Sequence, residues 1–309
     1  MKIQYALVFL FIGLAVIASL AFFFYFSSFQ FELDNVELDN VVLDKIGIIY
    51  LSGEIISSGE FPHVNTISTG ELQRALENAH RDDKVKAIVL AVDSPGGLAD
   101  ASYEMYSMVK GFEKPIVAFI RGTGASGAYL VSLGADRIVA NPFSIVGSIG
   151  VFIVLDKQVP VEPENVEEIF AITSGKLKNV WADGVLDENE REYLEMKVDE
   201  INDSFLNIIF QRTEINRADV ENIEDNLENP IFQLAEGGWF NGEKALELKL
   251  VDSLGDMDSA LELASELSGV ELDEVDVVII MPPPPGTYGN MLYETPLYRD
   301  NQIPPIYLK

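Results

Sequence analysis

The chain has 309 residues, 48% of them hydrophobic, and 50 acidic against 21 basic residues give it a formal net charge of −29. It has no cysteine, which excludes disulfides, thiol catalysis and cysteine metal sites, and its two histidines, His63 and His80, leave little scope for a histidine metal site. Because so negative a field repels nucleic acid, we expect no nucleic-acid partner; the spread of the acids is typical of a solvated surface or of adaptation to high salt.

An uncharged segment near the N-terminus has the length of a membrane-spanning helix. Tyr5 to Phe26 carries no charge over 22 residues, whereas the apolar core of a signal peptide has about 7–15. No small-x-small cleavage site follows, so residues 1–28 are predicted to be an uncleaved anchor. Lys2 precedes this segment and an acidic connector, residues 29–45, follows it. We therefore expect a single-pass protein of the cell membrane with its globular part on the extracytoplasmic side.

Residues 46–280 carry the pattern of an α/β domain. Short apolar runs typical of buried strands alternate with helical segments, which predicts a mostly parallel sheet with helices on both faces. The expected strands are 46–51, 87–92, 115–120, 137–140 and 270–280, and the expected helices are 68–82, 100–112, 187–211 and 241–250. Residues 281–309 are proline-rich without periodicity, which is typical of an extended tail or docking arm.

Two glycine-rich turns follow two of the expected strands. Asp93–Gly97 (DSPGG) comes after 87–92, and Gly122–Ala128 (GTGASGA) comes after 115–120. In a parallel sheet both turns fall at the carboxyl ends of strands, where active sites collect. Ser126, flanked by small residues at an expected helix N-terminus, is the candidate nucleophile. The candidate oxyanion donors are backbone N–H groups that a substrate can approach closely, those of Gly96, Gly97 and Gly127.

Each turn has alternative interpretations. Glycines and small residues are also required by strand-to-helix turns for geometry alone. Gly122–Gly127 matches the G-x-G-x-x-G pattern of dinucleotide sites as well, but a ribose-binding acid does not follow about 20 residues later. Val139–Pro142 occupies that place. The pattern therefore favours a serine nucleophile over a cofactor site, and we expect neither a cofactor nor a metal.

A serine nucleophile needs a general base. His63 lies in a turn-like segment and His80 at a charged helix end, so neither is framed by a glycine-lined pocket. A lysine can serve if burial keeps it neutral. Lys176 and Lys178 stand in an apolar frame, ITSGKLKNVW, and in an extended chain both point to the same face. Alternation does not choose between them, and an exposed basic edge is the competing interpretation.

At these residues the sequence resembles the signal peptide peptidase A family, serine peptidases with a Ser–Lys dyad. The family pattern, [DN]SPGG, then GxxASGGY, then SGxxK, is matched at Asp93–Gly97, Gly122–Tyr129 and Ser174–Lys178. Residues 145–151 also resemble the family's GSIGV stretch, and residues 239–246 with Leu250–Asp252 resemble a later motif. One departure is visible, because Ala128 replaces the second glycine of ASGG. The resemblance spans about residues 46–267.

The resemblance implies a Clp-protease/crotonase-like fold and a short, single-domain serine peptidase. It selects Lys178, which closes SGxxK, as the base, and the 30-residue step from Gly96 to Ser126 resembles that of Clp proteases, which supports Gly96 as an oxyanion donor. It also implies a homo-oligomeric ring and substrates such as cleaved signal peptides. Two alternatives stay open on the same fold, a crotonase-type acyl-thioester enzyme and a non-catalytic membrane scaffold.

Overall fold

The computed structural model describes residues 22, 43–57, 65–155, 177, 180, 186–221, 226–281 and 294–296. The chain divides after Val42 into two compact units, and the second, from Leu43 onward, holds every described strand. Within the described residues no helix is both long and apolar enough to cross a bilayer. The anchor expected at Tyr5–Phe26 lies outside them except for Phe22, which is helical and exposed.

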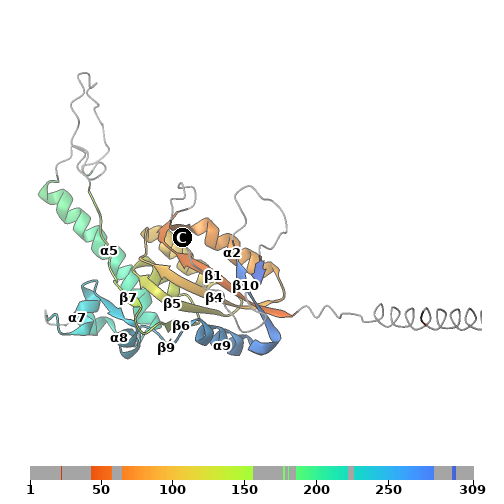
Figure 1. The fold of residues 1–309 in the computed structure, drawn as a ribbon. Helices are drawn as coiled ribbons and strands as arrows, with labels where there is room; N and C mark the ends of the chain where they lie inside the picture. Colours follow the sequence, from red (N-terminus) through yellow and green to blue (C-terminus); the bar gives the residue numbers. More distant parts are fainter. Residues whose placement is uncertain are drawn as a thin grey trace, which may run out of the picture. The chain divides into compact units, whose positions relative to one another are not determined.

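A mostly parallel sheet forms the centre of this unit (Figure 1). Its strands lie in the order β11–β10–β1–β4–β5–β6–β9, with β7 paired to β5 and β8 to β7. Among the described pairings of this sheet only β10–β11 and β7–β8 are antiparallel. The strands are β1 (Asp44–Ser52), β4 (Val85–Ser94), β5 (Ile116–Ala125), β6 (Arg137–Ala140), β7 (Ile145–Gly147), β8 (Trp239–Asn241), β9 (Ser253–Leu254), β10 (Val275–Ile280) and β11 (Glu294–Pro296). A separate parallel pair joins β2 (Glu54–Ile56) to β3 (Thr66–Ser68).

Helices cover both faces of the sheet, as the alternating pattern predicts. Side chains alternate along β4, so Ile88 and Leu90 enter one apolar cluster while Val89 and Ala91 enter the other. The first cluster contains buried residues of α2 (Thr69–Arg81), α3 (Ala99–Lys110) and α4 (Gly127–Ser132). The second contains Ala260 and its neighbours from α9 (Met257–Ser268), on the opposite face in Figure 1. Burying each large side chain contributes about 1.5–3 kcal/mol.

Local sequence fixes where several helices begin. Ser68 caps α2 through a capping box with Glu71, and Asp187 does the same for α5 (Glu188–Arg212) with Glu190, as its sequence predicts. Such a cap stabilises a helix by about 1 kcal/mol. Asn241 caps α8 (Gly242–Glu247). The remaining described helices are α6 (Arg217–Glu221), α7 (Pro230–Ala235) and the short 3₁₀ turn η2 (Leu272–Glu274).

Four features differ from the sequence-based expectation. The segment 121–125, interpreted as part of a turn, continues strand β5, because Thr123–Ala125 pair with β7. The helix α9 was not predicted, although Asp256 caps it and its buried residues keep helical spacing up to Gly269. Within the expected tail, β11 pairs with the edge strand β10. The strand expected at 270–280 begins only at Val275, after η2.

Candidate active site

Ser126 lies between the end of β5 and the first residue of α4, in a backbone conformation that serine rarely adopts. Its φ and ψ are 50° and −124°, and a non-glycine residue at positive φ stores about 1–3 kcal/mol of strain. Hydrogen bonds on both sides hold it there. Its N–H donates to the Gly147 carbonyl at 2.8 Å, and its carbonyl accepts from the Leu130 N–H at 3.0 Å. The half-buried serine is therefore fixed at the carboxyl end of the sheet.

The structure brings the Asp93–Gly97 turn directly against Ser126. Gly96 has a φ of 96°, and a Cβ added to it would lie 2.7 Å from the Gly127 nitrogen and 2.9 Å from Ser126 Cβ. Both the positive φ and the close approach require glycine here. The pairing of Ser94 with Gly124 across β4 and β5 sets this juxtaposition, because parallel neighbours end at the same edge.

The three candidate oxyanion donors differ in what their N–H groups already bond. The Gly96 N–H donates to Ser94 Oγ at 3.1 Å, so it is not free to hold a substrate oxygen. The Gly97 N–H donates to no described residue, and its nitrogen lies 3.4 Å from a Cβ placed on Gly127. Gly127 begins α4, so its N–H has no acceptor within the helix. The N–H groups of Gly97 and Gly127 thus have no described acceptor, whereas that of Gly96 is engaged, and the Gly96 donor implied by the 30-residue step stays a prediction.

The helix that follows Ser126 is too short for its dipole to stabilise much charge there. The helix α4 has six residues, fewer than two turns, so its summed dipole is small. An N–H aimed at the developing oxyanion commonly contributes about 3–4 kcal/mol. Two N–H groups beside one serine hydroxyl are an arrangement that acyl transfer can use.

Other motif residues hold the turns in place. Asp93 Oδ1 accepts the Thr123 N–H at 3.0 Å and so ties the end of β4 to β5. The stretch that resembles GSIGV supplies β7, and Gly147 pairs with Trp239 of β8. Ser148 has a φ of 50°, and its N–H donates to the Gly238 carbonyl at 2.8 Å. Four of the five matched motifs therefore converge on Ser126.

The expected base lies where the structure gives no description. Lys176 and Lys178 are outside the described residues; Leu177 between them is described and exposed. His63 is also outside them. His80 is exposed at the end of α2, where its Nδ1 lies 3.9 Å from Glu113 Oε2, and no contact joins it to either glycine turn.

Lys114 is a described lysine with a depressed pKa, but it lies at the amino end of β5, far from Ser126. Desolvation by burial lowers the pKa of Lys114, against the opposing effect of Asp82 and Asp83. Its Nζ donates to the carbonyls of Ala79 and Asp82 at 2.7 and 2.8 Å. The strand between it and Ser126 spans about 30 Å, so Lys114 cannot act as the base within one subunit.

Tyr129, three residues after the serine, anchors α4. It is fully buried, and its hydroxyl donates to the Leu250 carbonyl at 2.7 Å. Burial raises the pKa of Tyr129, so it stays neutral and serves packing rather than proton transfer. This contact links the Gly122–Tyr129 motif to the Leu250–Asp252 motif.

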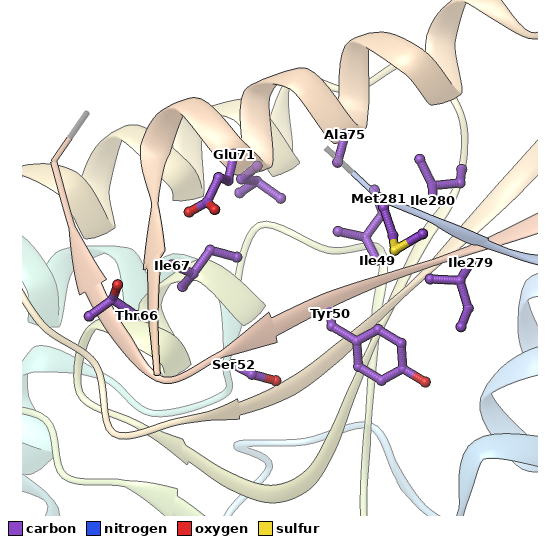
Figure 2. A pocket seen from close by; sticks show the side chains of 11 residues that line it. Ile49, Tyr50, Ser52, Thr66, Ile67, Glu71, Ala75, Ile279, Ile280 and Met281 are labelled. Carbon is purple, nitrogen blue, oxygen red and sulfur yellow. The ribbon is translucent and has the colours of Figure 1, made fainter. Parts of the chain in front are cut away.

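An apolar cavity of about 200 Å³ lies under α2, away from the serine. Figure 2 shows Ile49, Ile67 and Ala75 around it, with Glu71 at one side. The Glu71 carboxylate is occupied by the capping box with Ser68, at 2.8 Å from its N–H. None of the residues of the two glycine turns lines this cavity, so it is separate from the site around Ser126.

Comparison with known proteins assigns the family. The family model for peptidase family S49 matches residues 110–271, more than half of the chain. The chain belongs to peptidase family S49. The model for Clp protease matches residues 48–143, which supports a Clp-protease-like α/β fold for this S49 peptidase.

Curated relatives agree with this assignment. A candidate protease from Methanocaldococcus jannaschii is 31% identical over 75% of this chain and 73% of its own length. Protease 4 from Salmonella typhi is 28% identical over 75% of this chain, which spans only 36% of that relative. A candidate signal peptide peptidase SppA from Enterococcus faecium is 30% identical over 70% of this chain and 60% of its own length. The S49 peptidase is thus a serine peptidase of the signal peptide peptidase A type.

Sequence reasoning missed the residues that act through the backbone. Ile55, in β2, donates its N–H to the Gly96 carbonyl at 2.9 Å and accepts from the Leu98 N–H at 2.9 Å. Gly147 supplies the carbonyl that holds the Ser126 N–H. No side-chain type marks a backbone contact, although the glycine before Ser148 is a signal for a positive φ.

Proposed function

We propose that this S49 peptidase is a membrane-anchored endopeptidase in which Ser126 and Lys178 form a Ser–Lys dyad. The observation that carries the proposal is the placement of a strained serine beside two backbone N–H groups without described acceptors, those of Gly97 and Gly127. Lys178 enters from the SGxxK pattern, and a neutral lysine is the base that this histidine-poor chain can offer.

The mechanism is amide hydrolysis through an acyl-enzyme. Ser126 Oγ attacks the peptide carbonyl carbon while neutral Lys178 takes the hydroxyl proton, and the Gly97 and Gly127 N–H groups hold the oxyanion. Collapse of the tetrahedral intermediate breaks the C–N bond as protonated Lys178 donates to the leaving amine. A water molecule then attacks the ester, with Lys178 again as base, and Ser126 is released.

Apolar peptides, including cleaved signal peptides, are the substrates that the surroundings of the site favour. Leu98, next to Gly97, is 40% exposed, and Trp239, paired with Gly147, is 61% exposed. Phe152, shortly after Ser148, is 82% exposed. Large apolar side chains exposed around a nucleophile supply binding area for an apolar peptide. The acidic surface would in turn disfavour acidic peptides.

The anchor and the assembly are further parts of the proposal. Tyr5–Phe26 would hold the protein in the cell membrane with the catalytic domain outside the cytoplasm, because Lys2 stays on the inner side. Protease added to intact spheroplasts should then digest the domain, and full protection would contradict this orientation. A homo-oligomeric ring is proposed from the family resemblance.

Labelling with a fluorophosphonate serine probe tests the nucleophile. The wild-type protein should react and hydrolyse an apolar peptide, whereas Ser126→Ala should lose both by at least about 1,000-fold. Ser107→Ala is the matched control, because Ser107 is exposed on α3 and its hydroxyl donates to the Tyr103 carbonyl. Retention of labelling in Ser126→Ala would overturn the assignment.

The same assay separates the alternatives. A non-catalytic scaffold would leave the wild type unlabelled and without hydrolysis. An acyl-thioester enzyme would turn over thioesters at a rate that Ser126→Ala leaves unchanged, because a crotonase-type reaction uses the oxyanion hole without a serine ester.

A further inference from the structure

The DSPGG turn contains a buried hydroxyl that the mechanism above does not use. Ser94 is the last residue of β4 and is fully buried. Its Oγ accepts the N–H of Gly96, two residues later, at 3.1 Å. Serine side chains that bond the backbone two residues ahead fix tight turns. The hydroxyl therefore constrains the backbone on the amino side of Gly96.

A second contact constrains the carboxyl side of Gly96. The Gly96 carbonyl accepts the Ile55 N–H at 2.9 Å, so it points toward β2. In a planar trans peptide the N–H points opposite to the C=O. The Gly97 N–H consequently points away from β2, toward the side where Gly127 lies.

Two adjacent glycines would not keep this orientation by themselves. Glycine populates positive and negative φ about equally, so the peptide between Gly96 and Gly97 has other accessible orientations. The bond to Ser94 stabilises one of them, because losing it leaves a buried N–H without an acceptor, which is unfavourable. Rotation of Gly96 would relieve that cost and at the same time turn the Gly97 N–H away from the serine.

We infer that Ser94 is a positioning residue, whose hydroxyl orients the Gly96–Gly97 peptide so that the Gly97 N–H faces the oxyanion. The inference rests on the proposed function of Ser126. Ser94 itself does not touch substrate. Its effect should therefore appear in the stabilisation of the transition state and not in substrate binding or in the titration of the base.

The test compares Ser94→Ala with Ser94→Thr in the full-length protein, with the active-site concentration set by fluorophosphonate titration. Ser94→Ala should lower kcat per titrated site about 10- to 100-fold, less than the loss of a whole donor, with KM within about threefold. Ser94→Thr keeps the hydroxyl and should recover most of kcat. A peptide aldehyde, whose adduct carries the oxyanion, should bind Ser94→Ala more weakly by a similar factor, and the acidic limb of the pH profile should not move.

Ser265→Ala is the matched control, because Ser265 is also a buried serine. It lies on α9, away from the site, and its hydroxyl donates to the Val270 carbonyl. It should change the melting temperature only. If Ser94→Ala does not fold, Ser94→Cys takes its place, since a thiol is a poor acceptor. The inference would be overturned if the variant without the hydroxyl kept kcat per site within twofold of wild type. It would also be overturned if Ser94→Thr lost as much kcat as Ser94→Ala. Failure of the wild type to label would instead refute the proposed function.

Discussion

The two ends of the central strands are built in opposite ways. At the carboxyl ends of β4, β5 and β7, Gly96, Ser126, Gly147 and Ser148 all have positive φ, and the N–H groups of Gly97 and Gly127 have no described acceptor. Among the described residues leading into β1, β4 and β5 none has a positive φ.

At the amino ends the polar groups are paired. Lys45 Nζ lies 2.9 Å from Asp82 Oδ2, Lys114 caps the carbonyls at the end of α2, and the Ile116 N–H donates to Asp136 Oδ2 at 2.8 Å. Strained backbone thus lies at the carboxyl end of the sheet, and paired polar groups lie at the amino end. This distribution indicates that the amino end contributes mainly to stability and the carboxyl end mainly to activity. Substitutions should therefore separate the two.

The largest effect is expected at Lys178, the proposed base. Lys178→Ala should lower kcat by at least about 1,000-fold, because Ser126 then lacks a base, while Lys176→Ala should keep most of the activity. The wild-type rate should rise with pH as the lysine loses its proton. If the Lys176 variant were inactive and the Lys178 variant active, Lys176 would be the base instead. Both lysines lie outside the described residues, so this assay decides between them.

Gly96→Ala should have the next largest effect, on activity and stability together. Its Cβ would lie 2.7 Å from the Gly127 nitrogen at a φ of 96°, so the oxyanion donors must shift. We expect kcat to fall about 100-fold or more. The control is Gly269→Ala, which has a φ of 71° but nothing within 4 Å of the added Cβ. It should lower the melting temperature and leave kcat unchanged; equal kcat losses would mean that strain alone matters.

Asp93 offers a smaller perturbation at the same end. Its carboxylate accepts the Thr123 N–H in an exposed bond, so Asp93→Ala should lower kcat only about tenfold. Asp93→Asn retains an acceptor oxygen and should stay near the wild type. Peptide hydrolysis by the two variants, measured side by side, decides whether this acceptor or the negative charge is needed; an equally impaired Asp93→Asn would point to the charge.

The smallest effect is expected away from the site, at the cap of α9. Hydrogen bonds from Ser259 lower the pKa of Asp256, so its carboxylate stabilises the fold above the usual carboxyl range. This contribution is lost as pH falls through the depressed pKa. Asp256→Ala should thus lower the melting temperature at neutral pH by a few degrees, by less at low pH, with kcat unchanged. A difference that grows on acidification would contradict the role of the carboxylate.

The sequence predicted the elements with strong local patterns. Buried strands such as 87–92 and the capping box at Asp187 were found because apolar runs and cap residues act locally. The extension of β5 through Ala125 was not, since it depends on pairing with β7. The sequence also could not show which of the Gly96 and Gly97 N–H groups lacks an acceptor. Both residues are glycines, and only the direction of a peptide plane distinguishes them.

The hydrogen bond from Ser126 to Gly147, and the pairing of Gly147 with Trp239, have a consequence for biosynthesis. Ser126 is held in its strained conformation by a segment that is in turn held by a strand more than 90 residues farther along the chain. Contacts this distant in sequence form late and slowly. A nascent chain that has left the ribosome only as far as α5 carries the serine without the support that poises it. We therefore expect peptide hydrolysis to begin only after the strand that contains Trp239 has been translated and has paired with Gly147.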